Sequence, residues 1–246
     1  MLKQVLVFLV FINCFYSSAQ SFKATQQKCE RVKTAYTEKW ETLQKELTKQ
    51  GIDKNNFQLF FRVFKKDKMV EVWLKSNDKK QFQLFKTYNI CASSGDLGPK
   101  RKQGDNQVPE GFYTVAVFNP YSNYYLSLGV SYPNQSDKIL DFNNPGGDIM
   151  IHGNCVTIGC LPLTDEYIKE VYVLAVEAKN NGQQTIPIHI FPTRLDDKGM
   201  KYLQTNYEKA SLIDFWKNLK TGFDYFELHH QLPKVTVDKK GKYVFE

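Results

Sequence analysis

The sequence predicts a mainly β fold of the α+β class, a sandwich or barrel-like domain with helices at its periphery. Short runs rich in β-branched and aromatic residues recur between positions 57 and 191, whereas helical spacing is confined to segments before, between and after them. The chain has 246 residues, of which 42% are hydrophobic, 14% aromatic and 24% charged. This composition excludes a disordered polypeptide and suffices for a sizeable core.

The first helix and the strands follow from residue spacing. Apolar residues at steps of three and four from about 26 to 50 predict an N-terminal helix, within a helical segment at 20–56. Alternating and β-rich runs then predict seven strands. These lie at 57–64, 69–74, 82–90, 111–118, 124–130, 148–152 and 185–191.

The remaining helices and strands are shorter. Thr164 is a suitable N-cap for a helix at 165–179, which Gly182 would close. We therefore expect one domain at 57–193, with a mixed extension at 194–246 packed on it. This extension would contain helices at 199–207 and 212–219 and strands at 235–237 and 242–245.

The N-terminus has the pattern of a secretory signal peptide. An unbroken apolar run at 5–12 is followed by small residues at 17–19, which favours cleavage after Ala19. A membrane anchor is the alternative, but the run is shorter than the ~20 residues that a span needs. Lipidation of Cys14 would require a small residue where Asn13 stands. We expect residues 1–19 to be removed, no transmembrane segment to remain, and the protein to be exported.

The net charge of +7 comes from 33 Lys and Arg against 26 Asp and Glu. The basic residues are scattered, and no basic helix or aromatic–basic ladder is present. This pattern is typical of a solvated surface, so we predict no nucleic-acid partner.

The segment at 150–163, MIHGNCVTIGCLPL, combines the residue types that cysteine catalysis needs. A thiol reacts as its thiolate, and a neighbouring imidazole can take its proton. His152 and Cys160 are eight positions apart, which suits two adjacent strand ends joined by a short loop. Gly159 would allow close backbone approach, and N–H groups around Cys160 would stabilise an oxyanion. These residues indicate acyl transfer by a cysteine.

Here the sequence resembles the YkuD-type L,D-transpeptidase catalytic domain family. The resemblance rests on His152-Gly153 followed by Thr157-Ile158-Gly159-Cys160, and on the upstream Gly104-Asp105 and Pro109-Glu110-Gly111-Phe112-Tyr113. It is nearest to the subgroup that includes the amidase releasing a lipoprotein from peptidoglycan. That subgroup shares Ile90-Cys91, the run at 94–100, and Asp224-Tyr225-Phe226-Glu227.

The resemblance implies a periplasmic or cell-envelope enzyme that acts on peptidoglycan stem peptides and requires no cofactor. Cys160 would be the nucleophile and His152 the general base, with Gly153, Thr157 and Gly159 lining the site. The backbone N–H groups of Gly159 and Cys160 would contribute to the oxyanion hole. Two features depart from the family pattern: Ile158 stands where His or Arg is common, and the spacer between His152 and Cys160 is short.

The implied reaction cleaves the bond at the L-centre of meso-diaminopimelate and passes the acyl group to an amine. Water in place of the amine would give a hydrolase, such as a carboxypeptidase, an endopeptidase or an amidase releasing a peptidoglycan-linked lipoprotein. An inactive peptidoglycan-binding module is a further alternative. Lys100 and Arg101 in the loop at 93–111 would pair with stem carboxylates, or be solvated loop charges, and Tyr125 would line a substrate cleft or pack on a strand.

Four cysteines would remain after signal removal, and several pairings are open. Two disulfides are the general expectation for an exported protein. A Cys155–Cys160 bridge would trap the nucleophile, whereas Cys91–Cys155 would leave Cys160 free and Cys29 unpaired. A zinc site of His152, Cys155, Cys160 and His189 matches no common spacing, so we predict no metal.

Overall fold

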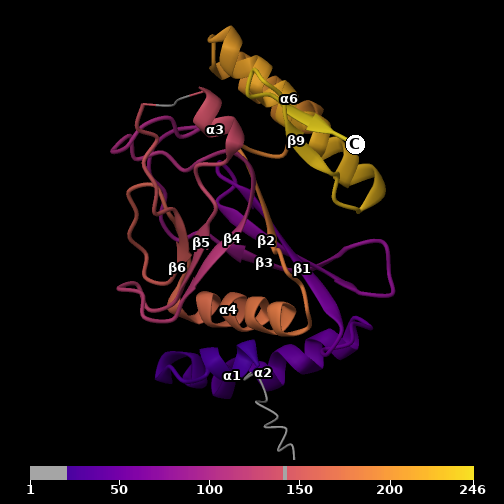
Figure 1. The fold of residues 1–246 in the computed structure, drawn as a ribbon. Helices are drawn as coiled ribbons and strands as arrows, with labels where there is room; N and C mark the ends of the chain where they lie inside the picture. The colour runs from indigo at the N-terminus through magenta and orange to yellow at the C-terminus, as the bar shows by residue number, and fades with distance from the viewer. Residues whose placement is uncertain (1–20, 141–142) are drawn as a thin grey trace, which may run out of the picture.

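The computed structural model describes residues 21–140 and 143–246. It contains one curled eight-stranded sheet and a separate two-stranded hairpin (Figure 1). The strands of the large sheet are β1 (Phe57–Phe64), β2 (Met69–Ser76), β3 (Gln83–Asn89), β4 (Gly111–Asn119), β5 (Ser127–Val130), β6 (Met150–His152), β7 (Leu161–Pro162) and β8 (Pro187–Phe191). Their order is β3-β2-β1-β8-β4-β5-β6-β7. The predicted α+β fold with a β-rich core is confirmed.

Most neighbouring strands are antiparallel, but two pairs are parallel. β1 runs parallel to β8, and β6 runs parallel to β7. The pair β6–β7 closes one end of the sheet, and the loop between its strands holds the His-to-Cys segment. This end of the sheet therefore positions the candidate site.

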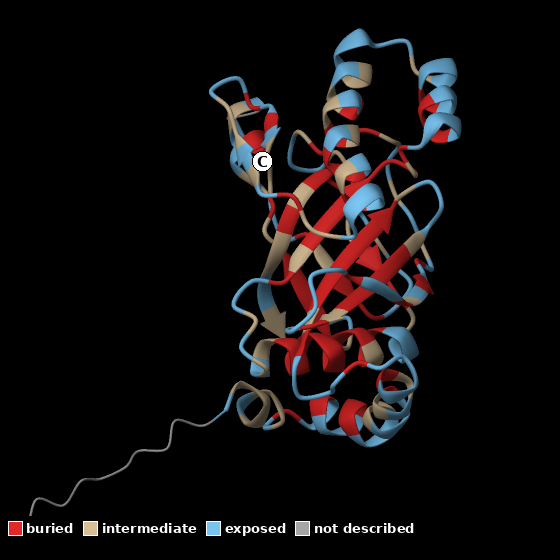
Figure 2. Cartoon of the chain, turned by 90° about the vertical axis from the view of Figure 1, so that its right-hand side faces the viewer, coloured by how far each residue is buried: buried red, intermediate tan, exposed pale blue. Residues whose placement is uncertain are grey.

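Helices cover one end of the sheet in two layers (Figure 1). Helix α4 (Asp165–Asn180) packs on β1, β5 and β6, and α1 (Phe22–Gln26) and α2 (Glu30–Lys49) pack on α4. Thr164 caps α4 as expected, because its side chain accepts a hydrogen bond from the Tyr167 N–H. Helix α4 is buried along most of its length (Figure 2), so it forms the centre of the main core.

The C-terminal part of the chain covers the opposite end of the molecule (Figure 1). It comprises α5 (Asp197–Asn206), α6 (Ala210–His229) and the hairpin of β9 (Val235–Val237) and β10 (Tyr243–Phe245). A second apolar cluster joins it to the sheet, with Trp216 fully buried among aromatic side chains. The extension thus shares its core with the strand ends near Phe64 and Phe191.

Several element boundaries differ from those that the sequence predicts. Helix α6 has 20 residues where the pattern predicted eight, and α3 (Gln135–Leu140) and the short strand β7 were not predicted. Packing extends α6, because Phe223 and Phe226 both contact the sheet side of the molecule. The predicted strand at 124–130 begins only at Ser127.

None of the helices in the described part of the chain is long and apolar enough to cross a membrane. The predicted signal peptide, with Cys14, lies outside the described residues.

Candidate active site

His152 ends strand β6, and Cys160 directly precedes β7, its parallel neighbour. Ile151 pairs with Leu161 in the register, and both are buried in the main core. Side chains alternate along a strand, so Met150 and His152 belong to the opposite face of β6. The register therefore brings the predicted base and the residue next to the predicted nucleophile onto neighbouring strands, although eight positions separate His152 from Cys160.

The His152 ring is held in one orientation by its own turn. Its Nδ1 lies 2.5 Å from the Gly153 carbonyl oxygen, an arrangement in which Nδ1–H donates and Nε2 is left to accept a proton. The Tyr124 ring lies 4.7 Å from the imidazole, centroid to centroid. Burial lowers the pKa of His152 below its usual 6.5, with partial opposition from the Gly153 carbonyl. The imidazole is thus neutral at pH 7.

Cys160 is a half-buried free thiol. Its Sγ lies 3.5 Å from the Asp148 carbonyl oxygen. Burial raises the pKa of the thiol above its usual 9.0; the Asp148 charge adds to this shift, and the Met150 backbone and Lys100 oppose it. At pH 7 the described site therefore holds a neutral thiol and a neutral imidazole, not a thiolate–imidazolium pair.

Thr157 organises the turn that presents Cys160. Its hydroxyl accepts hydrogen bonds from the Gly159 N–H at 3.1 Å and the Cys160 N–H at 2.8 Å, and donates one to the Cys160 carbonyl at 2.9 Å. The two N–H groups that the sequence suggested for the oxyanion hole are therefore occupied in this arrangement. Thr157 thus closes a local turn over those donors.

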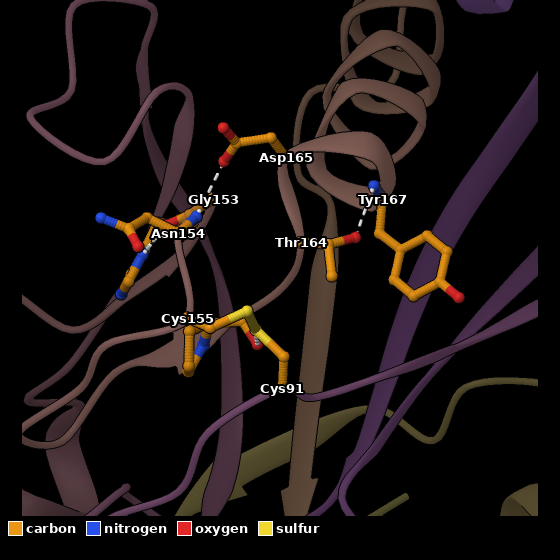
Figure 3. The surroundings of a disulfide bond; sticks show 9 residues. Cys91, Gly153, Asn154, Cys155, Thr164, Asp165 and Tyr167 are labelled. Atoms are coloured by element: carbon orange, nitrogen blue, oxygen red, sulfur yellow. Dashed lines mark hydrogen bonds between the residues drawn. A yellow bond between two sulfur atoms is a disulfide. The ribbon is translucent and has the colours of Figure 1, made fainter.

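Both glycines of the motif are required by close contacts. Gly159 has φ +133°, and a Cβ there would lie 3.1 Å from the Gln107 carbonyl oxygen. A Cβ on Gly153 would lie 2.5 Å from Asp165 Oδ1 at the start of α4. The same carboxylate accepts a hydrogen bond from the Asn154 N–H at 2.9 Å (Figure 3). Helix α4 thus holds the chain directly after His152.

A disulfide joins Cys91, which follows β3, to Cys155 in the His-to-Cys loop (Figure 3). The Cys91–Cys155 pairing that leaves Cys160 free is confirmed, and the Cys155–Cys160 pairing is wrong. A second disulfide is not formed in the described part of the chain, because Cys29 is a buried free thiol.

The zinc alternative does not fit the described residues. Cys155 is oxidised, and His189 is enclosed by the rings of Phe60 and Phe112. No group of three or more His, Cys, Asp or Glu in the described ranges could hold a metal ion.

A hollow of about 170 Å³ opens beside Cys160. The loop at 92–97 forms one wall, and Lys66 and Lys68 of the β1–β2 turn contribute positive charge to its lining. Both lysines are exposed. The sequence contains no signal that this turn lies beside Cys160, since 94 positions separate Cys160 from Lys66.

The predicted substrate-binding residues are engaged elsewhere. Lys100 is buried, and its Nζ donates to Asp105 Oδ1 at 2.6 Å and to the Lys102 carbonyl at 2.8 Å. Arg101 pairs with Asp137 at 3.0 Å. Tyr125 packs against the main core, with the Arg31 guanidinium 5.9 Å from its ring centroid, so Tyr124 is the tyrosine in contact with His152.

Comparison with known proteins identifies the class. The family model for the L,D-transpeptidase catalytic domain (YkuD) matches residues 60–190. The chain belongs to this family, whose members modify peptidoglycan. It is 37% identical over 188 residues to YafK of Escherichia coli K12, named as a putative L,D-transpeptidase, and equally to YafK of strain O157:H7. Each match covers 76% of this chain and 73% of the relative.

Solved structures give more distant matches. The helical cell shape determining protein Pgp2 from Campylobacter jejuni matches with a TM-score of 0.45 and 18% identity, covering 75% of this chain and 74% of its own. Bd1075 of Bdellovibrio bacteriovorus matches with a TM-score of 0.40 and 20% identity, covering 76% of each chain.

Proposed function

We propose that this protein is an exported cysteine acyl-transfer enzyme that acts on peptidoglycan stem peptides at the L-centre of meso-diaminopimelate. The observation that carries the proposal is the placement of His152 at the end of β6 and of Cys160 directly before the parallel strand β7, with His152 Nδ1 held by the Gly153 carbonyl. The family membership supports peptidoglycan as the substrate. The signal-peptide pattern at 1–19 supports export to the periplasm or cell envelope.

In the first half-reaction, His152 Nε2 takes the proton of the Cys160 thiol as sulfur attacks the carbonyl carbon. Because both groups are neutral beforehand, the proton moves during attack, and His152 acts as a general base. The tetrahedral intermediate then collapses, and the C–N bond breaks. The leaving amine takes the proton from His152, and a thioester to Cys160 remains.

In the second half-reaction, an acceptor attacks the thioester carbonyl. His152 Nε2 takes a proton from the acceptor and returns it to the Cys160 sulfur as the C–S bond breaks. An amine acceptor produces a crosslink or an exchanged stem, and water produces a hydrolysed stem. Gly153 and Thr157 support this geometry from the base side and the nucleophile side, respectively.

The hollow beside Cys160 is the proposed position of the atoms flanking the scissile bond. Lys66 and Lys68 in its lining offer cations to a nearby stem carboxylate. Lys100 would act differently from the sequence expectation: its ammonium favours the Cys160 thiolate electrostatically, while its hydrogen bonds remain within the loop.

Hydrolysis of the same bond is the second candidate, and it includes release of a peptidoglycan-linked lipoprotein. The observation that favours it is the acceptor side of the turn, where Ile158 is 81% exposed and Val156 is 48% exposed. An open apolar edge provides no polar group to orient an amine and does not shield a thioester from water.

Defined muropeptides test the proposal, with mass spectrometry of the products. The mature protein should yield crosslinked or amine-exchanged stems, and Cys160→Ala and His152→Gln should lose them. Products from water alone would assign the protein as a hydrolase. Intact substrates with the wild-type protein, lipoprotein-linked stems included, would refute the enzyme and leave a binding module.

A further inference from the structure

A second cavity of about 560 Å³ lies where the loop at 97–107 meets the C-terminal extension. Its walls come from that loop, the end of α3, the first turns of α6 and the turn between β9 and β10. The volume is in the range of sites that enclose small-molecule or short peptide ligands. We call it the C-terminal cleft.

The lining of the C-terminal cleft is amphipathic. An apolar part is formed by Leu97, Leu140, Leu212 and Phe215. The charged part contains four cations and one carboxylate, namely Arg101, Lys209, Lys240, Lys242 and Asp214. Such a surface suits a ligand with a partly apolar body and negative charge.

The three lysines are the cations available to a ligand. Arg101 already pairs with Asp137 and lies 5.4 Å from the centroid of the Phe215 ring. Lys209, Lys240 and Lys242 are exposed, and their ammonium groups form no ion pair or hydrogen bond with another described residue. Of the nearby carboxylates, Asp214 contacts Lys217 at 3.6 Å, and Asp238 accepts backbone hydrogen bonds in the hairpin turn and interacts electrostatically with Lys240 and Lys242.

The C-terminal cleft begins close to Cys160. Leu97 lines both this cleft and the hollow that contains Cys160. Gln107 also lines the cleft, and a Cβ on Gly159, the residue before Cys160, would lie 3.1 Å from its carbonyl oxygen. A chain bound with its reacting carbonyl at Cys160 would therefore pass over Leu97 into the cleft.

A buried carboxylate holds the segment at 97–98, which lies between the two cavities. Glu110 is fully buried and accepts hydrogen bonds from the Gly98 N–H at 2.7 Å and the Trp216 indole at 2.7 Å, and it pairs with Lys65 at 2.9 Å. The Glu110 carboxylate thus connects the segment at 97–98 to the sheet and to α6.

We propose that the C-terminal cleft is a remote subsite that binds the carboxylate-bearing part of the stem peptide away from the bond attacked by Cys160. Lys209, Lys240 and Lys242 contact the carboxylates, while Leu212 and Phe215 contact the apolar part of the peptide. This subsite rests on the proposed function for the identity of its ligand. It extends that function by making the C-terminal extension part of the specificity of the enzyme.

The test compares the triple variant Lys209→Gln/Lys240→Gln/Lys242→Gln with a matched control, Lys28→Gln/Lys49→Gln/Lys198→Gln. The control removes the same charge from exposed lysines that do not line the cleft. Each set is also combined with Cys160→Ala, and binding of an intact muropeptide and of its carboxyl-amidated form is measured by calorimetry. This readout does not depend on turnover.

The measured quantity is the ratio of the affinities for the free-carboxylate and the amidated muropeptide. We expect this ratio to fall roughly tenfold in the cleft variant and to stay unchanged in the control. An equal preference in both variants would overturn the subsite, as would failure of the Cys160→Ala protein to bind either form. Lysine-dependent binding in a protein that turns over no muropeptide would support the subsite and refute the proposed catalytic function, so the two failures are distinguishable.

Discussion

At the residue scale, the protonation state of the Cys160–His152 pair determines how the thiol is activated. Burial raises the pKa of Cys160 above 9.0 and lowers that of His152 below 6.5. In the free protein, alkylation of Cys160 by iodoacetamide should therefore be slow at pH 7 and accelerate above pH 9. Fast alkylation that is constant from pH 5 to 7 would contradict this, because it would show a preformed thiolate–imidazolium pair.

The lowered pKa of His152 also predicts how turnover depends on pH. His152 must be neutral to take the thiol proton, so kcat/KM should fall as the pH decreases through the lowered pKa of His152, below 6.5. Measurement of kcat/KM against pH with one muropeptide checks this. A fall that begins near pH 8 would require a different base.

Thr157 is expected to be a positioning residue for the Cys160 turn. Thr157→Val removes three hydrogen bonds, so it should lower kcat by about 10- to 100-fold and destabilise the fold by about 1–3 kcal/mol. Thr157→Ser retains the hydroxyl and should restore kcat. Equal kcat loss in both variants would contradict the role of the hydroxyl, because Thr157→Ser retains it, and thermal unfolding separates the stability part.

At the element scale, strand β8 places a histidine where protonation is unfavourable. His189 is 4% exposed between aromatic rings, and burial together with the charge of Arg62 lowers its pKa to about 3. In the unfolded chain its pKa is near 6.5, so protons bind the unfolded state more strongly between these values. The stabilisation is complete above pH 6.5 and is lost as the pH falls.

The expected slope is about 1.4 kcal/mol of unfolding free energy per pH unit between pH 6 and 3 from this residue. The variant His189→Gln should lack this contribution to the slope. This holds even if its unfolding free energy at pH 7 differs from that of the wild type. Denaturant unfolding at several pH values measures it, and identical slopes in both proteins would refute the buried neutral imidazole.

Element boundaries were predicted from the sequence only where local pattern and tertiary packing agree. Thr164 and the helix that it caps were predicted because the cap and the apolar face are local signals. Gly222 interrupts the helical pattern near the end of the chain, yet α6 continues through it. A Cβ there would lie 2.7 Å from the Phe112 ring, so tertiary contact selects glycine where propensity indicates a break.

The residues of the candidate site also fall into two groups: those that the local sequence brings together and those that only the fold brings together. His152, Gly153, Thr157 and Cys160 lie within one short segment, so the sequence motif was enough to group them. Lys66 and Lys68 reach the hollow through the β1–β2 turn, and no local pattern reports that this turn lies beside Cys160. Tyr124 and Tyr125 are adjacent with opposite environments, and alternation in an irregular segment does not tell which one contacts His152.

At the scale of the whole molecule, the Cys91–Cys155 disulfide joins segments 64 positions apart. In the chain-entropy account a closed loop of this length stabilises the fold by roughly 4 kcal/mol. The double variant Cys91→Ser/Cys155→Ser should lose about that much unfolding free energy and still contain an alkylatable Cys160. Loss of the thiol reactivity at unchanged stability would contradict a purely structural bridge.

The central claim is that Cys160 carries the acyl group, and intact-protein mass spectrometry during incubation with a muropeptide donor tests it most directly. We predict a mass increase equal to the donor stem minus its leaving amine, located on the peptide that contains Cys160 and missing from Cys160→Ala. Product formation without this adduct, or an adduct on another residue, would contradict the account.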